Sequence, residues 1–267
     1  MNEIKLKSPF AQLWKDKDPF QEVELISGKV YREVKQRKTL NFQFNDESYF
    51  IKIHRGTTVK EIVKNLLSLR LPVLDAKQEW DAIARLEQAN VNTMDGRAFG
   101  RKSLNPLTRH SFIVTKDLNP TISLEDFTKT WLTSPPNYHL KRSLIIYLAN
   151  MTAKMHAAGV NHRDCYLCHF LLDIPLFEKQ KQIKLSVIDL HRAQTRNKVP
   201  RRWRDKDLIG LYFSSTNIGL TKRDIWLFLK VYFNKPLKTI LLDEHKLISN
   251  TEQKAEKIRK RTEKYNL

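Results

Sequence analysis

Two aspartates, Asp164 and Asp189, lie in local sequences that suit the chemistry of moving a phosphoryl group. Asp164 closes the triplet His162-Arg163-Asp164, on a loop just beyond a helix that we expect to end near Gly159. Asp189 follows an apolar stretch, residues 185–188, with the composition of a buried strand. One carboxylate that orients a hydroxyl and one that holds a magnesium ion are the minimum apparatus of a kinase catalytic lobe.

Such a site also needs a lysine that reaches the ATP phosphates and a glutamate that holds this lysine. Lys52 lies on an expected strand, and an expected helix from Gln78 to Gln88 carries Glu79 on its apolar stripe. A carboxylate aimed at the core needs a partner, and Lys52 is the candidate. A solvated Glu79 at the edge of the stripe is an equally good interpretation.

Alternation of apolar and polar residues and helical spacing predict the elements around these residues. We expect a strand at 40–44, a turn at 45–47, a strand at 49–53, helices at 58–71 and 78–88, a strand at 111–115, a helix at 141–158 and a helical, basic C-terminal part. This order predicts an α+β protein with two unequal lobes. We interpret the strand at 111–115 as an edge strand.

The predicted division runs between residues 115 and 116. Residues 1–115 form a small, mostly β N-lobe with helices, which holds the nucleotide lysine and the glutamate helix. Residues 116–267 form a larger, mostly α C-lobe with the catalytic loop, the metal-binding strand and basic helices. We expect a cleft near Thr115 to Asp117, which makes Asp117 a nucleotide-binding candidate.

Several positions depart from the usual kinase pattern. A glycine-rich phosphate loop is missing, since only Gly28 lies near the first expected strand pair. His169 stands where a metal-binding asparagine is usual, and imidazole is a softer ligand than magnesium prefers. The metal candidates are therefore Asp189 and His169, with the second in doubt. Leu190-His191 replaces Phe-Gly, and no Ala-Pro-Glu follows, so the activation segment of protein kinases is absent.

A competing motif overlaps the catalytic loop. Residues 165–169 read Cys-x-x-Cys-His, which is also typical of c-type haem attachment, of thioredoxin chemistry or of a zinc site. Haem attachment normally follows export, the order of elements does not suit thioredoxin, and zinc would lack a second ligand pair. Cys165 and Cys168 are best interpreted as small apolar residues that pack the loop.

Six basic residues and Trp203 lie between Arg196 and Lys206. A charge run is usually a solvated face, but its place after the metal-binding strand favours an anionic-acceptor site. The substrate-binding candidates are Lys198, Arg201, Arg202 and Arg204. Asp207 opens a further expected helix, where its carboxylate either braces the catalytic loop or is a helix N-terminal charge.

Composition limits the classes of protein. The 48 Lys and Arg against 29 Asp and Glu give a net charge of +19, which attracts polyanions such as nucleic acid, acidic membranes or acidic proteins. The 41% hydrophobic content supports a real core. No apolar run is long enough to span a bilayer, the N-terminal residues lack a secretion signal, and two cysteines give no disulfide framework. We expect a soluble cytoplasmic protein.

Three long and uncommon strings carry a resemblance to a known family. They are residues 162–166 (HRDCY), 187–194 (VIDLHRAQ) and 201–211 (RRWRDKDLIGL), with 105–108 (NPLT) and 120–124 (PTISL) beside them. The chain resembles, nearly end to end, the lipopolysaccharide core heptose(I) kinase family of Gram-negative bacteria.

The resemblance implies a protein-kinase-like bilobal fold that transfers the ATP γ-phosphate to a hydroxyl of the first heptose of the inner core. It places the catalytic aspartate at Asp164, the metal-binding aspartate at Asp189 and the nucleotide pair at Lys52 and Glu79. It implies ATP and Mg²⁺ as cofactors and the inner-core glycolipid as partner. It further implies a peripheral location at the cytoplasmic face of the inner membrane, to which a basic protein is drawn, and acyl carrier protein as a further partner.

Two alternatives stay open from the residues themselves. A protein kinase that acts on Tyr or Ser/Thr would use the same aspartates, although the missing Ala-Pro-Glu and Tyr166, two places beyond Asp164, argue against a Ser/Thr protein kinase. A basic pseudokinase or nucleic-acid-binding module would use the charge run, with Asp164 structural and His169 a sign of lost metal binding. The joint presence of Lys52, Glu79, Asp164 and Asp189 makes a nucleic-acid partner the last choice.

Overall fold

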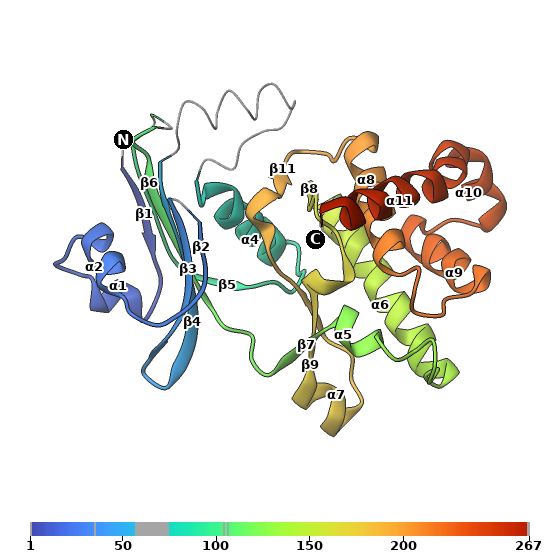
Figure 1. Ribbon diagram of the computed structural model, residues 1–267, viewed down its shortest axis with the longest axis horizontal. Coiled ribbons are helices and arrows are strands. Elements are labelled where there is room, and N and C mark those ends of the chain that lie inside the picture. Colours follow the sequence, from blue (N-terminus) through green and yellow to red (C-terminus); the bar gives the residue numbers. More distant parts are fainter. Residues whose placement is uncertain (1, 35, 57–74, 104, 106, 266–267) are drawn as a thin grey trace. The chain divides into compact units, whose positions relative to one another are not determined.

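The computed structural model describes residues 2–34, 36–56, 75–103, 105 and 107–265 (Figure 1). The chain divides into two compact units: the first is Met1–Ala84, Met94–Asn119 and Leu190–Arg192, and the second is Arg85–Thr93, Pro120–Asp189 and Ala193–Leu267. The helix expected at 58–71 lies outside the described residues. The functional division expected between residues 115 and 116 stays a prediction.

The first unit contains a six-stranded antiparallel sheet with the strand order β1-β5-β6-β4-β3-β2. Its strands are β1 (Glu3–Leu6), β2 (Lys29–Val34), β3 (Arg37–Phe44), β4 (Glu47–Arg55), β5 (Asp95–Lys102) and β6 (His110–Lys116). Its helices are α1 (Phe10–Leu13), α2 (Pro19–Leu25) and most of α4 (Lys77–Gln88), and the short 3₁₀ turn η2 (Leu190–Arg192) also belongs to it.

Alternation along β3 and β4 gives the sheet two distinct faces. One face packs on α1 and α2 in a core rich in aromatic rings, which contains Phe10, Trp14, Phe20, Val23, Leu40, Phe42, Tyr49, Ile51 and Ile53. Lys52 lies between two of these core residues and therefore points to the opposite face. On that face, Trp80 of α4 stacks on Phe99 of β5, with ring centroids 5.5 Å apart.

The strands expected at 40–44, 49–53 and 111–115 and the helix at 78–88 are confirmed. The interpretation of residues 111–115 as an edge strand is wrong. β6 pairs with β4 on one side and with β5 on the other, and β1 and β2 form the edges of this sheet. The physical reason is visible in the consecutive buried residues Phe112, Ile113 and Val114, since a strand covered on both faces is apolar on both.

The second unit is mainly helical (Figure 1). Its helices are α5 (Leu124–Thr128), α6 (Tyr138–Ala157), α7 (Ile174–Gln180), α8 (Arg201–Ser214), α9 (Lys222–Phe233), α10 (Leu237–Asp243) and α11 (His245–Tyr265), with the 3₁₀ turn η1 (Leu167–His169). Two small antiparallel sheets complete it: β10 (Leu185–Val187), β9 (Phe170–Asp173) and β7 (Thr121–Ser123) in that order, and β11 (Gln194–Thr195) with β8 (Val160–Asn161).

Helix α6 delivers the chain to the loop that carries Asp164. The helix ends at Ala157, as the sequence predicts, and Gly159 follows in a left-handed conformation with φ of +81°. A Cβ atom on Gly159 would lie 1.8 Å from the carbonyl oxygen of Arg196. Only glycine therefore allows the turn from α6 into β8 at this place.

Helix α8 begins at Arg201, so the expectation that Asp207 opens this helix is wrong. Pro200 supplies the extended residue before the first turn, and Asp207 lies inside the helix and is buried. The next two residues, Leu208 and Ile209, pack with Ala149, Tyr232 and Leu247 in the helical core. Among the described helices, none is both long and apolar enough to cross a bilayer.

Candidate active site

Lys52 and Glu79 form the ion pair that the sequence suggests. The Lys52 Nζ atom lies 2.8 Å from Glu79 Oε1, and the Glu79 side chain is only 1% exposed. The interpretation of Glu79 as a solvated residue is therefore wrong. The pair fixes the ammonium group of Lys52 on the face of the sheet away from the aromatic core.

Asp117 follows β6 and is fixed to the β3–β4 hairpin. Its carboxylate accepts hydrogen bonds from the Ser48 hydroxyl at 2.9 Å and from the Asn41 amide at 3.5 Å. Its backbone N–H donates to the carbonyl oxygen of Ser48 at 2.9 Å. These contacts hold the end of β6 in one position, and they leave a nucleotide-binding role for Asp117 as a proposal.

Asp207 braces the loop that carries Asp164, as one of the two sequence interpretations predicts. Its carboxylate accepts the backbone N–H of His162 at 2.6 Å and that of Arg163 at 2.8 Å. The Asp207 side chain is fully buried, so both bonds are shielded from water. A carboxylate that accepts two backbone amides fixes the peptide planes directly before Asp164.

His162 ties the same loop to the strand that ends at Asp189. The ring is fully buried, and burial lowers the pKa of His162 below its ordinary value, so the imidazole is neutral near pH 7. Its Nε2–H donates to the carbonyl oxygen of Ile188 at 2.9 Å. The two acidic segments of the second unit are therefore joined through one histidine.

His169 contacts both the predicted catalytic residue, Asp164, and the predicted metal ligand, Asp189. Its Nδ1–H donates to the backbone carbonyl of Asp164 at 2.7 Å, and its Nε2 lies 3.7 Å from Asp189 Oδ2. The ring stacks on that of His162, with centroids 5.2 Å apart and planes 10° apart. The structure thus brings Asp164, His169 and Asp189 together. In the described ranges, no three His, Cys, Asp or Glu side chains converge as a metal cage would require.

Two residues of this site have a backbone conformation that is rare for side-chain-bearing residues. Arg163 has φ of +73° and Asp189 has φ of +58°. Positive φ costs energy for residues other than glycine and persists where surrounding contacts enforce it. Here the hydrogen bond from Arg163 N–H to Asp207 is one such contact.

The two cysteines of the loop are free thiols. Burial raises the pKa of Cys165 well above its ordinary value and raises that of Cys168 to about 11. Both thiols are therefore protonated near pH 7, whereas metal binding and disulfide exchange need the thiolate. These observations favour the packing role over haem, zinc or redox chemistry.

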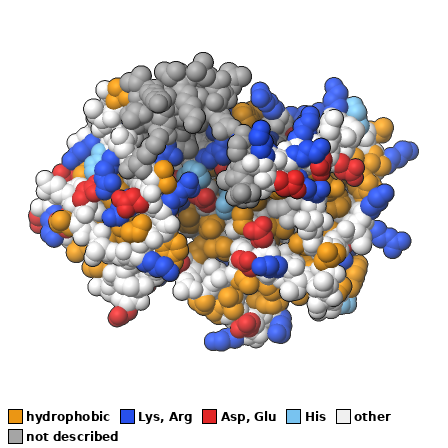
Figure 2. All heavy atoms as spheres, viewed as in Figure 1, with side chains coloured by type: hydrophobic (Ala, Val, Ile, Leu, Met, Phe, Trp, Pro, Cys, Tyr) orange, Lys and Arg blue, Asp and Glu red, His pale blue; other side chains and the backbone are white. Residues whose placement is uncertain are grey.

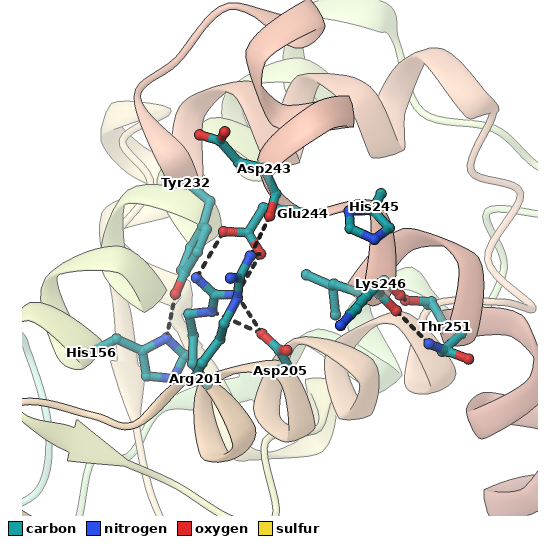
Figure 3. A network of polar contacts seen from close by, with 12 residues as sticks. His156, Arg201, Asp205, Tyr232, Asp243, Glu244, His245, Lys246 and Thr251 are labelled. Carbon is teal, nitrogen blue, oxygen red and sulfur yellow. Dashed lines mark hydrogen bonds and ion pairs between the residues drawn. The ribbon is translucent and has the colours of Figure 1, made fainter.

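The basic run between Arg196 and Lys206 divides into two kinds of residue. Arg196 donates to Asn161 and Gln194, which makes it part of the β8–β11 contact. Arg201 and Arg204 both bind the carboxylate of Glu244, and Arg204 also binds Asp205 (Figure 3). Lys198 and Arg202 are exposed. Glu244 lies 40 residues after Arg204, and no pattern in the sequence predicted that the two would pair.

Glu244 is expected to stabilise the fold in a pH-dependent manner. Burial opposes its charged form, but hydrogen bonds from Arg204 and Arg201 outweigh burial and lower the pKa of Glu244 below 4.5. Because the folded-state pKa lies below the ordinary value of 4.5, ionised Glu244 stabilises the fold above pH 4.5. This stability is lost as the pH falls through the folded-state pKa. We expect Glu244→Gln to lower the free energy of unfolding by about 1–3 kcal/mol near neutral pH.

Urea unfolding of both proteins at several pH values checks this prediction. The difference between wild type and Glu244→Gln should shrink as the pH falls well below 4.5, because protonated Glu244 resembles glutamine. If the difference in the free energy of unfolding stays constant over that pH range, the ion pairs of Glu244 are not its cause.

His156 contacts the Asp207 carboxylate and is itself held by Tyr232. The sequence analysis identified neither residue. Burial raises the pKa of Tyr232, so its hydroxyl keeps its proton and donates to His156 Nδ1 at 2.7 Å. His156 Nε2 lies 3.2 Å from Asp207 Oδ2. Figure 3 shows the contact between His156 and Tyr232. The network leads from α9 through α6 to α8 and on to the catalytic loop. His156 and Tyr232 lie on two separate helices, and hydrophobic periodicity within one helix cannot predict a polar contact between two.

Comparisons with known proteins agree with this geometry. Residues 21–232 match the model of the lipopolysaccharide kinase (Kdo/WaaP) family. The lipopolysaccharide core heptose(I) kinase WaaP of Escherichia coli is 62% identical over 97% of this chain and 98% of its own length. The protein of the same name from Pseudomonas aeruginosa is 52% identical over 97% of each chain.

A solved structure agrees as well. The structure of WaaP in complex with acyl carrier protein is 48% identical, covers 96% of this chain and 98% of its own, and superposes with a TM-score of 0.85. The predicted α+β, kinase-like fold is confirmed by this likeness. With the matched family model and these relatives, the chain belongs to the lipopolysaccharide kinase (Kdo/WaaP) family and is a kinase.

Proposed function

We propose that this kinase transfers the γ-phosphate of ATP to a hydroxyl of the first heptose of the lipopolysaccharide inner core. The observation that carries the proposal is the loop of Asp164, fixed by Asp207 and joined through His169 to Asp189. The names of the relatives support heptose as the acceptor.

In this proposal, Asp164 is the residue that touches the acceptor. Its carboxylate accepts a hydrogen bond from the heptose hydroxyl and aligns the oxygen with the γ-phosphorus. It takes the proton as the new P–O bond forms and the bond from the γ-phosphorus to the bridging oxygen of ADP breaks, so that ADP leaves. The rigid loop matters because phosphoryl transfer depends on positioning more than on covalent chemistry.

Asp189 would hold magnesium, and His169 fits this ion less well. A carboxylate oxygen is a ligand that Mg²⁺ accepts, whereas an imidazole nitrogen is a softer donor. The Nδ1–H of His169 is already bound to the Asp164 carbonyl, which supports a role in positioning Asp164 and Asp189. When bound, the metal supplies positive charge that offsets the charge of the phosphates.

Lys52, held by Glu79, would bind the phosphates of ATP. A lysine kept in place by a buried glutamate is the arrangement that kinases use for this purpose. Asp117, fixed by Ser48, stays a candidate for a nucleotide contact through its backbone or carboxylate.

Labelled phosphate transfer tests the proposal. Inner-core lipopolysaccharide without heptose phosphate, ATP and magnesium should yield labelled glycolipid, and a set of purified proteins offered as acceptors should not. Faster labelling of protein than of glycolipid would instead support the protein-kinase alternative. A folded protein that labels neither, but binds nucleic acid with strong salt dependence, would support the pseudokinase alternative.

A peripheral position at the cytoplasmic face of the inner membrane completes the proposal. Leu241 and Leu242 of α10 are 43% and 69% exposed. Lys238 and Lys246 lie beside them and are exposed, and Lys and Arg side chains line this end of the second unit in Figure 2. Exposed leucines among cations suit the surface of an anionic bilayer.

Vesicle sedimentation checks the membrane contact. We expect Leu241→Ser with Leu242→Ser to weaken binding to vesicles of anionic phospholipid by about tenfold, because two apolar side chains no longer enter the interface. Leu25→Ser is the matched control, since Leu25 is an exposed leucine of the first unit. An equal loss of vesicle binding in the control would show that α10 is not the membrane-contacting element.

Acyl carrier protein is a further proposed partner. The related solved structure contains it, and a net charge of +19 suits an acidic protein. The second unit also holds an apolar cavity of about 360 Å³, lined among others by Trp131, Leu148, Leu211, Leu229 and Leu247. A cavity of this size and character accommodates an acyl chain.

Thermal unfolding checks the role of the cavity. We expect acylated carrier protein to raise the Tm more than unacylated carrier protein, because only the former fills the cavity and ligand binding stabilises the native state. Ile218→Trp narrows the cavity and should remove this difference, while Leu25→Trp should keep it. Equal stabilisation by both forms of the carrier protein would contradict a role for the cavity.

A further inference from the structure

Three cationic side chains surround one indole ring in the second unit. The guanidinium carbons of Arg163 and Arg202 lie 5.5 and 5.2 Å from the centroid of Trp203, and the Lys206 ammonium lies 5.6 Å from it. We refer to these four residues as the Trp203 cluster. Each contact is a cation–π interaction, which stabilises one cation on the ring but does not remove its charge.

The cluster concentrates positive charge. Three like charges within reach of one ring repel each other and create a local potential that favours an anion. The nearest acids along α8 have other partners: Asp205 binds Arg204, and Asp207 accepts two backbone amides. Arg202 and Lys206 are exposed and can reach a bound molecule, whereas Arg163 is only 9% exposed and forms the inner side of the cluster.

The cluster is part of the catalytic loop and not only of α8. Arg163 directly precedes Asp164, and its backbone N–H is held by Asp207. The inner cation of the cluster is therefore the residue directly before Asp164 in the chain. Arg201 and Arg204 lie on the same helix and bind Glu244 at 2.7 and 2.6 Å.

We infer that the Trp203 cluster is a subsite for an anionic group of the acceptor, a carboxylate or a phosphate, and that Arg202 and Lys206 contact this group. The inference rests on the proposed function and adds the residues that select a charged acceptor. In this inference Arg202 and Lys206 bind the anion, and Arg201 and Arg204, which bind Glu244, do not.

The test compares acceptors that differ only in charge. Inner-core oligosaccharide freed of lipid is used untreated, with its carboxylates amidated, or with its phosphates removed. The variant is Arg202→Gln with Lys206→Gln, and the control is Arg223→Gln with Lys230→Gln, which loses the same two charges from exposed positions on α9. Steady-state kinetics give KM and kcat for each acceptor and for ATP.

We expect the variant to raise KM for the untreated acceptor by about 10- to 100-fold, the range for loss of a charge-assisted contact. The kcat and the KM for ATP should stay unchanged, and the control should resemble wild type. Wild type should lose the same factor with one modified acceptor, and the variant should no longer distinguish it. Sensitivity to amidation identifies a carboxylate, and sensitivity to phosphate removal identifies a phosphate.

Two outcomes overturn the inference. In the first, the variant still distinguishes both modified acceptors, so other residues recognise the anion. In the second, the control raises KM as much as the variant does, so general charge and not a site is responsible. Calorimetric binding of the untreated oligosaccharide without ATP separates the two proposals: binding that the variant weakens supports the subsite even without transfer, and unweakened binding overturns it. Wild type that neither binds nor labels the oligosaccharide overturns both.

Discussion

Replacement of Asp164 by asparagine should lower kcat for phosphate transfer by about 10²- to 10⁴-fold. The amide can neither take the proton of the acceptor hydroxyl nor hold that hydroxyl as a carboxylate does. The backbone contacts of residue 164 survive, because His169 Nδ1 and the backbone N–H of Tyr166 bind its carbonyl oxygen and not its side chain. ATP affinity and thermal stability should therefore remain those of wild type.

Single-turnover kinetics and nucleotide binding measured on the same preparations check this prediction. Asp46→Asn is a suitable control, since Asp46 is exposed in the β3–β4 turn with φ of +60°, a conformation that asparagine also adopts. Turnover of Asp164→Asn near the wild-type rate would show that another group orients the acceptor.

Replacement of Asp207 by alanine should be the most damaging change to stability. It leaves the buried N–H groups of His162 and Arg163 without their acceptor and removes the partner of His156. Each buried unsatisfied donor costs about 1–3 kcal/mol, so two of them predict a loss of about 2–6 kcal/mol in the free energy of unfolding. Activity should fall further than the folded fraction does, because the loop of Asp164 loses its support.

Urea unfolding and kcat per folded molecule separate these two effects. Asp207→Asn should lie between wild type and alanine, because the amide keeps one acceptor oxygen. Asp205→Ala, two residues earlier on α8, removes a partly exposed ion pair with Arg204 and should cost no more than about 1 kcal/mol. Equal losses in the free energy of unfolding at Asp207 and Asp205 would mean that the hydrogen bonds from Asp207 to the loop do not stabilise the protein more than a surface ion pair does.

Local patterns predicted the ion pair of the first unit as one of two equal interpretations. Alternation along β4 places Lys52 on the face opposite Ile51 and Ile53, and the helical spacing of α4 places Glu79 inward. A buried carboxylate needs a cation, so two local rules led to one long-range contact. The role of Asp207 as a brace for the catalytic loop was one of two alternatives that the sequence left open, and the structure decides between them.

Boundaries were predicted less well where local signals are weak. Residues 201–206 are charged apart from Trp203, so apolar periodicity begins only at Leu208, and the start of α8 was placed too late. Pro200 directly before Arg201 was the signal that could have corrected it. Residues 111–115 were interpreted as an edge strand, and the pairing of β6 with both β4 and β5 shows that the strand is central.

Contacts between distant segments could not be predicted from the sequence. The spacing from Asp164 to His169 indicated an unusual metal position, yet it could not show that the ring faces both Asp164 and Asp189. Composition likewise could not divide the basic run into arginines bound by Glu244 and cations gathered on Trp203, because both kinds have the same local sequence character.

The most direct test of the central claim is to locate the new phosphate. Inner-core lipopolysaccharide is incubated with ATP, magnesium and either wild type or Asp164→Asn, and fragmentation mass spectrometry assigns the phosphate to one sugar. We expect one phosphate on the first heptose with wild type and none with Asp164→Asn. Phosphate on another sugar, or equal product from both proteins, would contradict it.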